Sequence, residues 1–87
     1  MMEATAVIKY PVSTERTIRL MEAENKLVFI CDRRAKKPEI KQALQELFNM
    51  KIKKVNTFIT RDGNKKAFVT LSKETTAMDV ATQLGML

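Results

Sequence analysis

The fold is decided by residues 51–72, KIKKVNTFITRDGNKKAFVTLS, which have the pattern of two strands joined by a tight turn. The dipeptide Asp62-Gly63 in the middle of this stretch is a strong hairpin signal, because a type I′ turn requires positive φ at both central residues. We therefore predict a strand from Lys51 to Thr60, and a second from Lys65 to Ser72 that pairs antiparallel with it.

The alternation of side chains assigns the two faces of this hairpin. Asn56 and Phe58 share one face of the first strand, and three residues share the other: Val55, Thr57 and Ile59. Ile52 is out of phase with that apolar face, which predicts a bulge near Lys53. In the second strand the apolar face consists of Ala67, Val69 and Leu71.

The residues before the hairpin contain two further strands and a short helix. Ala6–Tyr10 reads as a strand that Pro11 ends. A helix over about 14–23 follows, with Ser13 or Thr14 as its N-cap. Lys26–Asp32 is the next strand, and its apolar run is continuous rather than alternating. A continuous run favours burial on both faces, with helices on both sides of the sheet.

Two more helices complete the order of elements. Pro38 fits the first turn of a helix that ends near Asn49. Its apolar stripe is Ile40, Ala43, Leu44, Leu47 and Phe48. Thr76 and Asp79 have the spacing of a capping box for a last helix, which Gly85 would end.

The predicted order is β-α-β-α-β-β-α within one domain, residues 1–87, since no linker, repeat or low-complexity segment interrupts the chain. We predict an α+β fold with a four-stranded, mainly antiparallel sheet and flanking helices, in a three-layer α/β/α arrangement.

The charge of the chain points to an anionic partner. The net charge is +6 and the pI about 9.7. From Arg33 to Lys66 there are eleven basic and three acidic residues, a balance of +8, so the rest of the chain is slightly acidic. Such a one-sided charge distribution suits phosphate binding, to nucleic acid or a membrane surface, although solubility alone is the simpler alternative.

The chain lacks the residues that several kinds of catalytic and ligand-binding site require. The chain has no histidine, one cysteine and two glycines, so His-dependent catalysis, a four-ligand zinc site and a Gly-rich phosphate loop are excluded. Cys31 lies in an apolar run and is expected to be a small buried residue. No apolar stretch approaches the ~20 residues that span a bilayer. The first residues lack the pattern of a signal peptide, so we expect a non-enzymatic, cytoplasmic protein without cofactors.

The basic residues form two candidate phosphate-binding groups. One lies at the root and turn of the hairpin, and the other precedes the long helix. The hairpin group is Lys51, Lys53, Lys54, Arg61, Lys65 and Lys66, and the second is Arg33, Arg34, Lys36 and Lys37. We predict phosphate contacts from Arg33, Arg34, Lys37, Lys41, Lys53, Lys54, Arg61, Lys65 and Lys66. Asn56 and Thr57 can add hydrogen bonds to a phosphate or a 2′-hydroxyl. The competing interpretation is a solvated edge strand with protective lysines and an ordinary polar face.

A series of segments along the chain also matches a known family. These segments are Tyr10–Arg16 (YPVSTER), Asn25–Phe29 (NKLVF), Ala35–Lys41, Leu47–Phe48, Val55–Thr57, Lys65–Ala67, Asp79–Ala81 and Leu84–Gly85. Together they cover nearly the whole chain, in order. The sequence resembles the L-twenty-three family of large-subunit ribosomal proteins, and most closely its archaeal branch.

The resemblance implies an antiparallel α+β fold, binding to large-subunit rRNA beside the polypeptide exit tunnel, and a small helical neighbour of the L-twenty-nine family. It also implies a docking platform for signal recognition particle and the protein-conducting channel, with Glu15 at the motif linked to docking. The alternative is a basic RNA-binding or protein-docking module outside the ribosome. Bacterial relatives carry a long loop between the last two strands, whereas here the turn is only about Arg61–Asn64, which favours the archaeal type.

Overall fold

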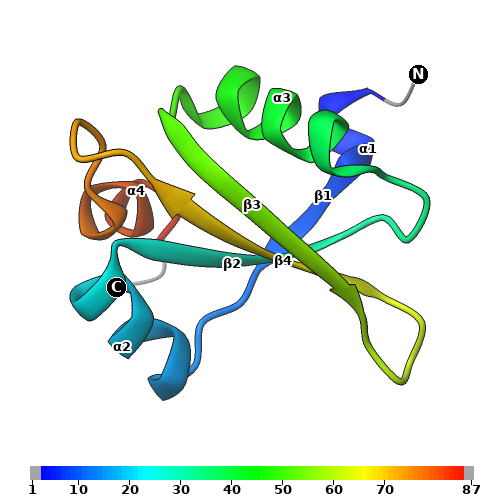
Figure 1. Cartoon of the computed structure of the whole chain (residues 1–87), viewed down its shortest axis with the longest axis horizontal. Coiled ribbons are helices and arrows are strands. Elements are labelled where there is room, and N and C mark those ends of the chain that lie inside the picture. The colour runs from blue at the N-terminus through cyan, green and yellow to red at the C-terminus, as the bar shows by residue number, and fades with distance from the viewer. Residues whose placement is uncertain (1–2, 86–87) are drawn as a thin grey trace.

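The computed structural model describes residues 3–85, which form four strands and four helices (Figure 1). In chain order these elements are α1 (Ala4–Val7), β1 (Ile8–Pro11), α2 (Glu15–Glu24), β2 (Lys26–Cys31), α3 (Lys37–Phe48), β3 (Ile52–Ile59), β4 (Lys65–Leu71) and α4 (Ala77–Gln83).

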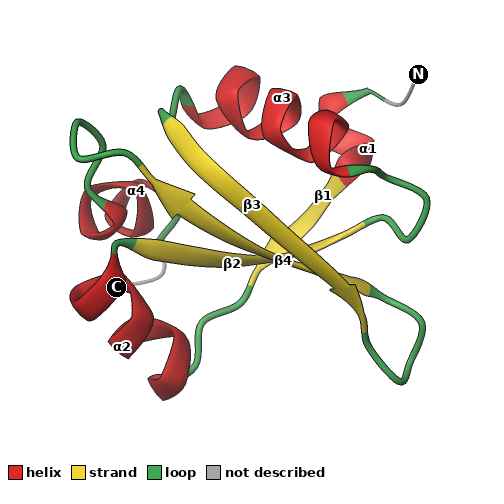
Figure 2. Cartoon of the chain, in the orientation of Figure 1, coloured by secondary structure: helices red, strands yellow, loops and turns green. Residues whose placement is uncertain are grey.

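The strands form one sheet in the order β1-β2-β4-β3, and every neighbouring pair is antiparallel (Figure 2). The two central strands, β2 and β4, are not consecutive in the chain: Lys26 pairs with Thr70, and Cys31 pairs with Lys65. The predicted α+β class and antiparallel sheet are confirmed.

One face of the sheet carries the hydrophobic core, and the helices are shared unequally between the faces. Helices α1, α3 and α4 contribute buried residues to the cluster that includes Leu27, Phe29 and Val69 of the central strands. Helix α2 lies along the edge of β2 (Figure 1), with Met21 in the core and Leu20 beside the opposite face. The second helical layer is therefore limited to α2, and much of that face of β3 and β4 stays open.

Burial on β2 follows the prediction from its continuous apolar run. Residues 27–31 are all buried, and Phe29 and Cys31 are fully inaccessible. Burial raises the pKa of the Cys31 thiol to about 11, against a smaller lowering effect of nearby Lys65. The thiol is therefore protonated at neutral pH and behaves as a small apolar side chain, as expected.

The first strand is shorter than predicted, because Ala6 and Val7 belong to the helical turn α1. The amides of both residues donate to the carbonyl oxygen of Glu3, at 2.9 and 3.1 Å. Val7 is buried where α1 packs against α3. The short apolar run fitted either a strand or a helix by pattern, and packing against α3 favours the helix.

The hairpin forms where it was predicted, but its turn is of a different type. The amide of Gly63 donates to the carbonyl of Thr60 (3.0 Å), and the amide of Thr60 donates to the carbonyl of Asn64 (2.8 Å). Gly63 alone in the turn has positive φ, at 85°, so the prediction of two such residues was wrong. This pattern is typical of a three-residue loop that ends in a glycine bulge. The predicted bulge near Lys53 is confirmed by the register shift between Ile52 and Lys54.

Helix α3 follows its apolar stripe closely. Pro38 lies in the first turn, Asn49 ends the helix with φ of 54°, and Ile40, Ala43 and Leu44 are buried. Leu47 departs from the prediction, since 38% of it is exposed at the outer margin of the stripe.

Helix α4 begins at Ala77, but the capping box predicted for Thr76 and Asp79 does not form. The amide of Ala77 donates instead to the side-chain oxygen of Asn25, at 2.6 Å. Asn25 lies in the turn between α2 and β2, so this cap comes from a distant segment. Gly85 ends the helix with φ of 74°, as predicted.

Candidate nucleic-acid interface

Four of the predicted phosphate-binding residues line one surface cleft between α3 and β3. The cleft has a volume of about 380 Å³, and its lining is Lys37, Pro38, Lys41, Lys53, Lys54 and Val55. We call it the α3–β3 cleft. Lys37 and Lys41 are one helical turn apart and so share a face of α3, while the bulge places Lys53 and Lys54 at the start of β3. All four lysines are exposed, and no acidic residue of the described chain is among the lining residues.

Gathering four ammonium groups around one cleft is unfavourable in the absence of counter-ions. Each pair of like charges repels, weakly in water and more strongly as water is excluded. A polyanion removes this repulsion and releases its own condensed counter-ions when it binds. The cleft therefore has the electrostatic character of a site for a phosphate backbone.

A second basic group lies at the turn end of the β3–β4 hairpin. The guanidinium of Arg33 approaches Gly63, and Arg61 is exposed in the turn itself. The ammonium of Lys65 donates to the carbonyl oxygen of Ala35, and this hydrogen bond links β4 to the segment between β2 and α3. Lys9 of β1, which the sequence did not single out, donates to the side chain of Asn64 at 3.3 Å.

Arg34 lies in the same connector but is already paired. Its backbone amide and its Nε both donate to one carboxylate oxygen of Asp32, at 2.8 and 3.2 Å. These bonds lower the pKa of the Asp32 carboxyl and raise the pKa of Arg34. The pair is close to neutral, so Arg34 offers less net attraction to a phosphate than Arg33 does.

Strand geometry separates two pairs that the sequence grouped together. Asn56 pairs with Phe68 and Thr57 with Ala67, so Asn56 lies on the open face and Thr57 on the core face. Lys65 and Lys66 are divided in the same way, and Lys66 lies on the open face opposite Phe58. Of these four residues, the open face presents Asn56 and Lys66.

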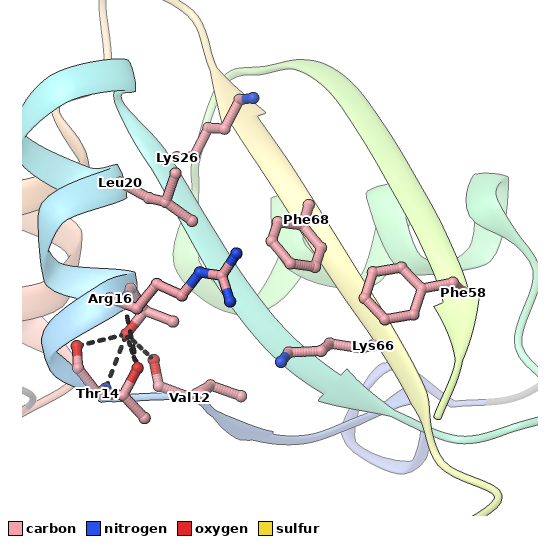
Figure 3. A pocket seen from close by; sticks show the side chains of 9 residues that line it. Val12, Thr14, Arg16, Leu20, Lys26, Phe58, Lys66 and Phe68 are labelled. Atoms are coloured by element: carbon pink, nitrogen blue, oxygen red, sulfur yellow. Dashed lines mark hydrogen bonds between the residues drawn. The ribbon is translucent and has the colours of Figure 1, made fainter. Parts of the chain in front are cut away.

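A groove on the open face escaped the sequence prediction (Figure 3). Its residues come from the loop before α2 and from α2, β2, β3 and β4, and they include Arg16, Lys26, Phe58, Lys66 and Phe68. The available signal was Phe58, a large apolar residue that shares a strand face with Asn56. Nothing in the local sequence indicates that Arg16 lies across from it.

Glu15 lies in the first turn of α2, where the helix dipole stabilises a carboxylate. The hydroxyl of Thr14 accepts from the amide of Thr17 at 3.2 Å and fixes this helix start. The side chain of Glu15 is 84% exposed and pairs with Arg19 at 3.0 Å. Its position on the surface is compatible with the docking role that the family resemblance implies.

Structural signs of other functions are lacking in the described part of the chain. Residues 3–85 contain no group of three or more histidine, cysteine, aspartate or glutamate side chains that could hold a metal ion. Over the same residues, no helix has the length and apolar character needed to cross a membrane.

Comparison with known proteins identifies the family. The family model described as Ribosomal protein L23 matches residues 6–79. Large ribosomal subunit protein uL23 of Methanococcus aeolicus and that of Methanococcus vannielii are each 47% identical to the chain over 85 residues, and that of Methanococcus maripaludis is 46% identical. Each alignment covers 98% of this chain and 99% of the relative. The chain therefore belongs to the ribosomal protein L23 family, in an archaeal type.

Proposed function

We propose that this protein, a non-enzymatic structural constituent of the large subunit of the cytoplasmic ribosome, binds large-subunit rRNA as one domain and does so near the polypeptide exit tunnel. The observation that carries rRNA binding is the α3–β3 cleft, where Lys37, Lys41, Lys53 and Lys54 meet from two elements. Arg33 and Arg61 at the hairpin turn would supply a second region of contact.

Lysine and arginine contacts of this kind position a protein on RNA without reading its sequence. In the proposed complex, phosphates lie along the α3–β3 cleft, and Asn56 hydrogen-bonds to RNA from the open face. Lys65 and Arg34 contribute less than expected from their charge, because Ala35 and Asp32 already engage them. Thr57 faces the core side, so we assign it only a minor contact.

The rRNA proposal predicts a change in the salt dependence of binding when the cleft loses charge. In a Lys41→Gln/Lys53→Gln variant, affinity for large-subunit rRNA fragments should fall, and the slope of log K against log salt should decrease by about two units, or about one for each contact. Binding is measured with purified protein over a salt series, on several fragments of the large-subunit rRNA.

A Lys51→Gln/Lys73→Gln variant is the control for net charge, because it loses the same formal charge at exposed positions outside the cleft, where Lys51 is paired with Glu74. Its slope should change clearly less than that of the cleft variant. Equal slopes for the two variants would show that the attraction comes from net charge alone. Equal binding of the wild-type protein to all fragments would argue against a specific rRNA site.

We further propose that the surface around Glu15 contributes to the docking platform for signal recognition particle and the protein-conducting channel. A neighbouring protein of the L-twenty-nine family would extend that platform. The support is the exposure of Glu15 at a capped helix start, together with its place in the segment Tyr10–Arg16. The turn of the β3–β4 hairpin is too short to provide a long loop, so this proposal does not include a tunnel-lining role.

The docking proposal predicts that Glu15→Lys weakens recruitment of targeting factors to ribosomes while subunit assembly stays intact. The cause is reversal of an exposed charge at the contact surface, since Glu15 makes no buried interaction. Recruitment is measured by co-sedimentation of the factors with ribosomes that carry the variant. Glu22→Lys, on the same helix, is the control. Equal loss with both variants, or failed assembly with Glu15→Lys alone, would contradict the docking role.

A further inference from the structure

The groove on the open face has the shape of a small ligand site. It has a volume of about 360 Å³, within the range of about 300–1,000 Å³ common for such sites. Figure 3 shows α2 along one side, with Arg16 and Leu20 turned toward the sheet, and the rings of Phe58 and Phe68 on the other. The two sides come from segments that are far apart in the chain.

The sheet side of the groove is an aromatic wall. The rings of Phe58 and Phe68 stack with their centroids 5.4 Å apart and an angle of 28° between their planes. Phe58 is 50% exposed and lies on the edge strand β3. A half-exposed phenylalanine gives up much of the stability that burial provides. The two neighbouring rings offer an apolar aromatic surface to a ligand.

Positive charge surrounds this wall. The ammonium of Lys66 lies 5.8 Å from the centroid of the Phe68 ring, and Figure 3 shows the guanidinium of Arg16 reaching over the groove. Within residues 3–85, Arg16 forms no ion pair, whereas Lys26 pairs with Glu24 at 3.1 Å. None of the described residues that line the groove is acidic. A ligand with an aromatic face and a negative charge matches this arrangement.

We propose that the groove binds an unpaired nucleotide of RNA, with its base stacked on the Phe58–Phe68 wall and its phosphate between Arg16 and Lys66. Stacking on aromatic side chains beside a basic path is the usual way in which proteins hold single-stranded RNA. A double helix cannot offer a base face to such a wall. This inference rests on the proposed rRNA binding and adds that one contact is made to an unstacked base.

The test compares a labelled single-stranded RNA with the same strand annealed into a duplex, using fluorescence anisotropy and the whole purified chain. Phe58→Ala should weaken binding of the single strand about 5- to 150-fold, because that is the effect of losing one stacked base. Duplex binding, which the α3–β3 cleft provides, should change less than about twofold by the same reasoning. Phe58→Tyr should bind like the wild type, since it keeps an aromatic face, whereas Phe58→Leu should not.

Thermal unfolding of each variant, followed by circular dichroism, shows that the fold is retained. If Phe58→Ala binds the single strand like the wild type while Lys41→Gln/Lys53→Gln binds weakly, the groove proposal is overturned and rRNA binding stands. If neither set of substitutions changes RNA binding, both proposals fail. An acidic peptide that contains phenylalanine tests the alternative occupant. If it binds more tightly than the single strand and Phe58→Ala abolishes that binding, the groove is a site for a protein partner and the nucleotide proposal is overturned.

Discussion

Phe29→Ala should lower the free energy of unfolding by about 3–5 kcal/mol, the largest effect expected from one substitution in this protein. Phe29 is fully buried on the central strand β2, and its ring stacks on Phe48 of α3 with the centroids 6.2 Å apart. Alanine would leave a cavity between the sheet and α3. Native proteins have about 5–15 kcal/mol of stability, and a domain of this size lies toward the low end, so the substitution should remove a large part of the total. Urea denaturation followed by circular dichroism measures the loss.

Phe58→Ala is the matched control for this prediction, because it removes the same atoms from a ring that is half exposed on the open face. Its cost should be about 1 kcal/mol, in proportion to the smaller area that the ring buries. Losses of equal size would mean that stacking on Phe68, rather than burial under α3, determines what a phenylalanine contributes here.

Asn25→Gly should lower the free energy of unfolding by about 2–3 kcal/mol, through the loss of long-range hydrogen bonds. The side chain of Asn25 donates to the carbonyls of Ser72 and Thr75, at 3.2 and 3.0 Å, and accepts from the amide of Ala77. It thus joins the turn before β2 to the start of α4. Glycine keeps the left-handed backbone, φ of 55°, so the substitution tests the side chain alone.

Asn49→Gly is the control, since Asn49 ends α3 with φ of 54° but is exposed. Its effect should lie within about 0.5 kcal/mol, as expected for a surface position without such bonds. Both variants are measured by thermal and urea unfolding. Equal effects at the two asparagines would show that the bonds from Asn25 to residues 72–77 contribute nothing net.

Local patterns were sufficient for most of the secondary structure. The stripe of α3 and the alternation of β3 and β4 follow from helical and strand periodicity, and both were predicted within a residue or two of their observed bounds. Two of the errors arose where a distant segment decides the outcome. Val7 is helical because α3 buries it, and α4 is capped by Asn25 rather than by its own Asp79.

The candidate site was predictable as a set of charges but not as a set of surfaces. The sequence indicated that residues 33–66 are basic, and the structure brings Lys37, Lys41, Lys53 and Lys54 to one cleft. How freely a charged side chain can reach RNA depends on its existing contacts. The ammonium of Lys65 already donates a hydrogen bond to the backbone carbonyl of Ala35. The groove needs Arg16 and Phe58 together, two residues that only the tertiary fold brings to one place.

The order of the strands also has a consequence for the time at which each surface can form. The α3–β3 cleft is made by residues 37–55, so closing it requires only a short loop. The groove joins residues 12–26 to residues 58–68, across the pairing of β2 with β4. Because longer loops cost more entropy and non-local pairing is slow, the cleft should form first during folding. A chain still completing its sheet could then hold RNA by its lysines before the groove is ready for a base.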